Sequence, residues 1–93
     1  MPRQARLDSP GTRHHVMIRG IEGRSIVDDD QDRNDFVRRL GELAVASGTP
    51  IYAWALMSNH AHILLSRGVL GLAPLMRRFL TGYAVNYNLR HRR

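Results

Sequence analysis

The chain has 93 residues, of which 43% are hydrophobic, so it encodes at most one small globular domain and is too apolar for a disordered segment. It contains no cysteine, which excludes a disulfide framework and thiolate metal sites and is compatible with a reducing cytoplasm. The net charge is +6, and every basic residue that contributes to it is an arginine.

The charges are divided unevenly along the chain. All eight acidic residues lie in the first 42 residues together with eight arginines, whereas six arginines and no acid follow from Leu43 onward. A second half that carries only positive charge suits the binding of a polyanion such as nucleic acid. The simpler alternative is that these arginines lie at the solvated end of a helix. No apolar run is long enough to span a membrane, and the polar start, Met1 to Thr12, is not a signal peptide. We therefore expect a cytoplasmic protein.

Residues 1–12 are expected to form an N-terminal arm that ends in a Ser9-Pro10-Gly11 turn signal. From Arg13 to Ile21 apolar and polar residues alternate, with Val16 and Ile18 in the more apolar set. A period of two is typical of a half-buried strand, and we expect the first strand here.

A helix is expected to begin at Asp28-Asp29-Asp30, because acidic side chains are favourable at a helix N-terminus. It is expected to end at Ser47-Gly48, with Gly48 in the left-handed conformation. Its apolar residues recur at helical spacing: Phe36, Val37, Leu40, Leu43 and Ala44.

Two further strands are expected to form a hairpin. Residues 51–57 are apolar nearly throughout, which predicts a central strand with Trp54 packed in the sheet. Ser58-Asn59 forms the turn, and residues 60–66 form the third strand. Alternation places Ala61, Ile63 and Leu65 on the core face and His60 and His62 on the other.

A last helix is expected from Leu72 to about Leu89, with Pro74 in its first turn. The order strand, helix, strand, strand, helix predicts an α+β fold of the ferredoxin-like, split β-α-β type. That fold has one more strand after its second helix, so we expect the chain to lack its last strand.

The His60-x-His62 pair has two interpretations. Two neutral imidazoles on one face of a strand can hold a divalent metal, provided that a third ligand comes from elsewhere. They can equally be two polar residues on an open sheet surface. The spacing alone does not decide between them.

Four segments in order carry a resemblance to a known family. They are Ala55-Leu56-Met57-Ser58-Asn59-His60-Ala61-His62-Ile63-Leu64-Leu65, His14-His15-Val16-Met17-Ile18-Arg19-Gly20, Asp32-Arg33-Asn34-Asp35-Phe36 and the helix from Met76 to Asn88. Together they resemble single-tyrosine HUH transposases, in the branch associated with REP-type repeats. The match covers nearly all of residues 13–93, which are expected to form a partial HUH domain.

The resemblance implies a function and a metal site. Members of the family bind DNA hairpins with adjacent single strands, and His60 and His62 would hold Mg²⁺ or Mn²⁺. A tyrosine on a later helix attacks the phosphodiester and is linked to the DNA 5′ end. The segment with that tyrosine has no counterpart here, so we expect a fragment deficient in cleavage. The alternative is a non-catalytic nucleic-acid-binding or dimerisation module, and a homodimer is expected from an unpaired sheet edge.

Tyr83 and Tyr87 lie four residues apart on the last helix. They are low-probability candidates for the nucleophile, since the family's own tyrosine segment has no counterpart here. Tyr83 also continues the apolar stripe, which favours a place in the core. Candidate phosphate contacts are the arginines of the second half: Arg67, Arg77, Arg78, Arg90, Arg92 and Arg93.

Overall fold

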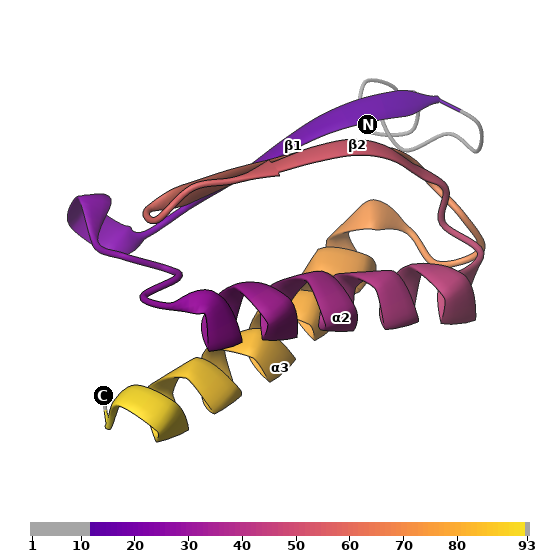
Figure 1. The fold of residues 1–93 in the computed structure, drawn as a ribbon. Helices are drawn as coiled ribbons and strands as arrows, with labels where there is room; N and C mark the ends of the chain where they lie inside the picture. The colour runs from indigo at the N-terminus through magenta and orange to yellow at the C-terminus, as the bar shows by residue number, and fades with distance from the viewer. Residues whose placement is uncertain (1–11, 93) are drawn as a thin grey trace.

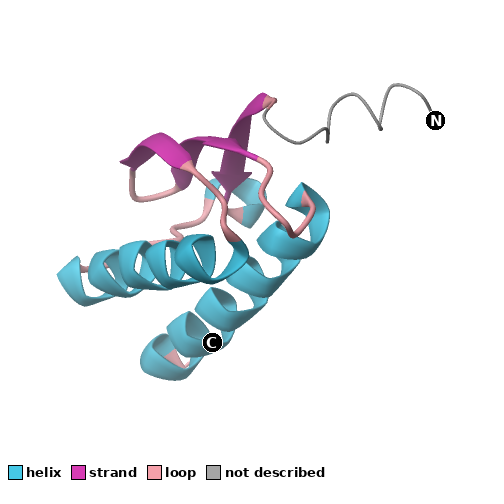
Figure 2. Cartoon of the chain, turned by 90° about the vertical axis from the view of Figure 1, so that its right-hand side faces the viewer, coloured by secondary structure: helices cyan, strands magenta, loops and turns pink. Residues whose placement is uncertain are grey.

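The computed structural model describes residues 12–92 and has the α+β fold that the sequence predicts. A three-stranded antiparallel sheet is covered on one face by two helices, and none of residues 12–92 forms a helix over its other face, called the open face below (Figure 1, Figure 2). The elements in chain order are β1 (Arg13–Arg19), the short 3-10 helix η1 (Ile21–Gly23), α2 (Asp30–Ser47), β2 (Ile51–Leu56), β3 (His60–Ser66) and α3 (Leu72–His91).

The strand order is β1-β3-β2, so the strand with the two histidines is the central one. The prediction that residues 51–57 form the central strand is wrong, because β2 lies at the edge and residues 52–55 are exposed. Trp54 is correspondingly 50% exposed rather than packed in the sheet. A short run of apolar residues does not distinguish an edge strand from a central one, because the pattern does not record which strands lie beside it.

The predicted inner face of β3 is confirmed. Ala61, Ile63 and Leu65 are at most 1% exposed, and they face the helices. The alternation in β1 is also confirmed, since Val16 and Ile18 pack against the same core. The helices contribute most of the other buried apolar side chains, namely Phe36, Leu40, Leu75, Phe79, Tyr83 and Tyr87, and Val27 and Leu56 complete the core.

Both ends of α2 follow the predicted chemistry. Asp29 is the N-cap, and its Oδ1 accepts a hydrogen bond of 2.9 Å from the backbone N–H of Asp32. Gly48 closes the helix with φ of 63°, a left-handed conformation that glycine adopts without steric cost. The helix α3 runs two residues further than predicted, to His91.

The connection from β1 to α2 folds back against the hairpin turn between β2 and β3. The backbone N–H of Gly20 donates to the carbonyl of Asn59 at 3.0 Å, and the N–H of Ile26 donates to that of Ser58 at 2.7 Å. A Cβ atom on Gly20 would lie 1.8 Å from the carbonyl oxygen of Arg24, so only glycine fits this turn. These contacts hold the connection beside the strand that begins at His60.

Between residues 12 and 92, neither helix is both long and apolar enough to cross a membrane. The predicted arm lies almost entirely outside the described residues.

Candidate metal and nucleic-acid site

His60 and His62 project from the face of the sheet that the helices leave open. Both side chains are half-buried, and their ring centroids lie 5.1 Å apart with the ring planes nearly perpendicular, at 87°. The period of two in β3 explains this placement, because residues 61, 63 and 65 occupy the helix-covered face. The strand thus presents two imidazoles side by side at the start of its outer surface.

The two histidines line a hollow of about 270 Å³ at one end of the open face. Strand β1 borders it because Met17 and Arg19 are the register partners of His62 and His60. The turn after β1 and the turn before β3 complete it. The lining residues are Met17, Arg19, Gly20, Gly23, Asn59, His60 and His62.

The hydrogen bond of His60 determines which of its nitrogens is available. The Nδ1 atom of His60 lies 2.8 Å from the side-chain carbonyl oxygen Oδ1 of Asn59. A carbonyl oxygen only accepts, so Nδ1 carries the proton and Nε2 carries the lone pair. Asn59 was predicted only as a turn residue, but it also orients the histidine that follows it.

A third histidine adjoins the pair. The Nε2 atom of His15, on β1, lies 2.8 Å from Nδ1 of His62, and the ring centroids lie 5.0 Å apart with nearly parallel planes. The alternation in β1 already places His15 on the outward face of the sheet, but it does not indicate which residue His15 meets there. The pairing of β1 with β3, and its register, were needed to bring His15 to His62.

The donor types of His60 and His62, two imidazole nitrogens, suit a divalent ion that has open coordination positions. Two neutral imidazoles are nitrogen donors of the kind that Mn²⁺ and Zn²⁺ accept, whereas Mg²⁺ prefers oxygen ligands. Within residues 12–92 no carboxylate lines this hollow, so solvent or a DNA phosphate would fill the remaining positions.

Two arginines that the sequence did not single out share the open face with the histidines. Arg19 borders the hollow, and its Nε donates to the sulfur of Met17 at 3.1 Å. Arg13, at the far end of β1, places its guanidinium 5.0 Å from the ring centroid of Tyr52. The open face therefore combines two cations and an exposed aromatic ring, features that suit a single-stranded nucleic acid.

The arginines predicted to bind phosphate lie elsewhere. Arg77, Arg78 and Arg92 are exposed on α3 or at its end, and that helix packs on the opposite side of the sheet from the histidines (Figure 1). Arg67 follows β3 and is half-buried, and Arg93 lies outside the described residues. The structure does not bring the α3 arginines onto the histidine face.

Arg90 is held by acidic residues at the start of α2. Its Nη2 lies 3.1 Å from Oδ2 of Asp29, and its Nη1 contacts Oδ1 of Asp32. The hydrogen bond from Arg90 lowers the pKa of Asp29. The guanidinium thus links the end of α3 to the start of α2, which leaves it less able to contact a phosphate.

Neither candidate tyrosine opens onto the histidines. The hydroxyl of Tyr83 donates to the carbonyl of Ile26 at 2.5 Å, and that of Tyr87 donates to Oδ1 of Asp28 at 2.8 Å. Burial, followed by the nearby carboxylate of Asp32, raises the pKa of Tyr83 well above its usual range. Both rings belong to the core between the helices and the sheet, so their placement favours the structural interpretation of Tyr83.

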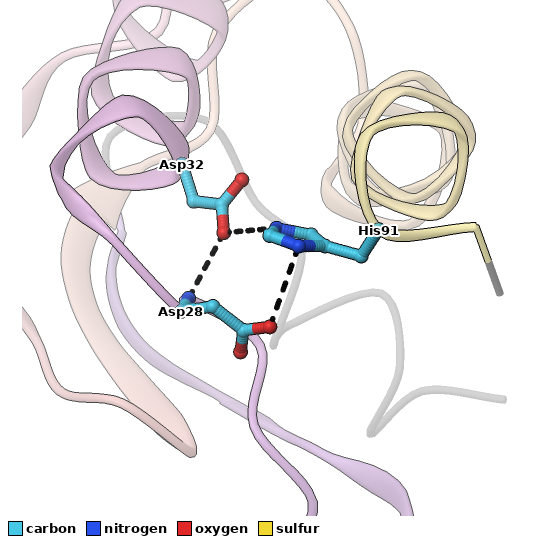
Figure 3. Close-up of side chains that lie close together, drawn as sticks. All are labelled: Asp28, Asp32 and His91. Atoms are coloured by element: carbon cyan, nitrogen blue, oxygen red, sulfur yellow. Dashed lines mark hydrogen bonds and ion pairs between the residues drawn. The ribbon is translucent and has the colours of Figure 1, made fainter.

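A second group of metal-ligand types joins the helix ends. Ligand atoms of Asp28, Asp32 and His91 lie within 4.8 Å of one another (Figure 3). Oδ2 of Asp32 accepts from the backbone N–H of Asp28 at 2.9 Å and lies 2.7 Å from Nε2 of His91. The guanidinium of Arg90 forms an ion pair with Oδ1 of Asp32, so the charge of this carboxylate is balanced by a side chain. We interpret the group as a structural connection between α2 and α3.

Comparison of the chain with protein-family models, with curated proteins and with solved structures gave no match.

Proposed function

We propose that the chain is a single-stranded DNA-binding and metal-binding domain of the single-tyrosine HUH transposase type. In this proposal the fold is ferredoxin-like, since the strand order β1-β3-β2 and two helices on one face suit that arrangement. The observation that carries the proposal is the pair His60 and His62, which line one hollow on the open face beside Arg19.

In this proposal His60 and His62 would hold a divalent ion, Mn²⁺ more readily than Mg²⁺, and the ion would polarise a phosphodiester oxygen of the bound DNA. Arg19 attracts the phosphate backbone to the hollow, and Tyr52 offers a ring on which a base can stack. Asn59 keeps the Nε2 lone pair of His60 available for the ion.

The nucleophile of the family reaction is not proposed to be Tyr83 or Tyr87, because their hydroxyls are engaged in the core. Tyr52 lies on the open face, but its hydroxyl is hydrogen-bonded to the hydroxyl of Ser66. Ser66 is four residues, or about 13 Å, along β3 from His62, so the Tyr52 hydroxyl is far from the histidine pair. The described residues therefore support binding of metal and DNA, and cleavage would require a nucleophile from outside them.

Metal binding tests the role of the histidine pair. We expect Mn²⁺ to bind the unchanged protein and to raise its melting temperature, because an ion that binds only the folded chain stabilises it. The variants His60→Ala and His62→Ala are expected to lose both effects. His14→Ala is the matched control, since it removes a histidine from the inner set of β1. Equal Mn²⁺ affinity in all four proteins, measured by electron paramagnetic resonance, would overturn the metal site.

DNA binding tests which surface is used. We expect Arg19→Gln to weaken binding to a hairpin with a single-stranded tail and to reduce the slope of log affinity against log salt by about one. Arg77→Gln on α3 is the matched control and should have little effect. Fluorescence anisotropy at several salt concentrations provides both quantities. Loss of affinity in Arg77→Gln alone would place the DNA on the helical layer instead.

The alternative proposal is a non-catalytic nucleic-acid-binding or dimerisation module. The outer edge of β1 pairs with no strand in the described part of the chain, and an apolar hollow lies between it and α3. Such an edge favours a homodimer through strand pairing. Analytical ultracentrifugation over a range of concentrations tests this, and a monomer throughout would exclude it.

A further inference from the structure

A hydrogen bond joins one ring nitrogen of His15 to one of His62, and the tautomers of the two rings decide which nitrogen donates. Nε2 of His15 lies 2.8 Å from Nδ1 of His62, a distance at which one atom donates and the other accepts. The planes of the two rings are also nearly parallel, with an angle of 16° between them. This contact joins β1 to β3 across the open face, outside the backbone pairing of the strands.

The two proton positions have opposite consequences for His62. If its Nδ1 donates to His15, the lone pair of His62 lies on Nε2 and can bind a metal ion. If Nδ1 of His62 accepts from His15, Nε2 of His62 carries the proton and cannot bind a metal ion. The neutral imidazole has no third arrangement.

We propose that His15 is a positioning residue that accepts the hydrogen bond of His62 Nδ1–H and thereby keeps His62 Nε2 available to a metal. This inference rests on the proposed function, in which His62 is a metal ligand. His15 itself does not line the hollow, so it is not assigned as a ligand.

The neighbouring histidine has the same arrangement with a different acceptor. His60 donates through Nδ1 to the amide oxygen of Asn59 and presents Nε2. A metal-binding histidine usually donates its other N–H to a neighbouring acceptor, which orients the ring and selects the tautomer. In this chain Asn59 would do so for one ligand and His15 for the other, from a different strand.

The tautomer of His62 can be observed without any metal. In the nitrogen-15-labelled protein at about pH 8, long-range proton–nitrogen correlation spectra distinguish Nδ1–H from Nε2–H. We expect Nδ1–H for His62 in the unchanged protein and a shift to Nε2–H in His15→Leu. His62 in the Nε2–H form in the unchanged protein would overturn the proposal.

Metal affinity provides the second measurement. Loss of such an acceptor typically weakens metal binding by about 10–100-fold, and we expect this for Mn²⁺ in His15→Leu. His15→Gln keeps a side-chain carbonyl that accepts from Nδ1–H, so it should restore most of the affinity. His15 is exposed, so both variants should fold. His14→Leu is the control, because His14 belongs to the other set of β1.

The two measurements separate the two ideas. If the unchanged protein binds no Mn²⁺, the metal function fails, while an Nδ1–H tautomer that depends on His15 still supports its positioning role. If Mn²⁺ binds equally well to the His15→Leu variant, the positioning role is overturned and the metal function stands.

Discussion

Replacing Phe36 with alanine is expected to reduce the free energy of unfolding by about 4 kcal/mol, the typical cost of removing a buried phenylalanine. Phe36 is 2% exposed and lies at the junction of the two helices and the sheet. Its ring meets Phe79 edge to face at a centroid distance of 4.8 Å and meets Tyr83 at 5.1 Å. Removing it leaves a cavity and breaks both aromatic contacts.

A domain of this length has a total stability of about 5–14 kcal/mol, so the loss would unfold a visible fraction of the protein. Urea denaturation followed by circular dichroism provides the measurement. Val45→Ala on the same helix is the control, because Val45 is 84% exposed and its loss should change stability by less than about 0.5 kcal/mol. Equal denaturation midpoints for the two variants would contradict the placement of Phe36 in the core.

Replacing Asp32 with alanine is expected to cost about 3 kcal/mol, because a buried carboxylate with several donors would be removed. Asp32 is 1% exposed and accepts from the backbone N–H of Asp28 and from His91 (Figure 3). It also accepts from Arg90. The expected loss of stability lies at the low end of the range for breaking a buried ion pair. The reason is that Arg90 and His91 are partly exposed and can be solvated once Asp32 is removed.

The matched control is Asp30→Ala, which removes the same charge from the same turn of α2 at an exposed position. Its effect should stay within about 0.5 kcal/mol. Thermal unfolding of the two variants at neutral pH compares them directly. A loss in Asp32→Ala no larger than that in Asp30→Ala would show that the group joining α2 and α3 contributes little.

The local elements of this chain could be predicted from its residues. The outward and inward sets of β1 and β3, the caps Asp29 and Gly48, and the course of α3 all follow from short-range patterns. Such patterns are readable because the strand period, the helix period and the capping geometry involve neighbours only a few residues apart. The two histidines were identified for the same reason.

Tertiary structure decided what those patterns left open. It made β2 an edge strand, brought His15 to His62 across 47 positions of sequence, and placed Arg19 beside His60. It also bound Arg90 to acids at the start of α2 and the hydroxyl of Tyr83 to Ile26. Each of these results depends on strand order, on register or on which helix faces pack together. A sequence pattern with a period of two or 3.6 records which residues share a face, but it does not record which other element that face meets.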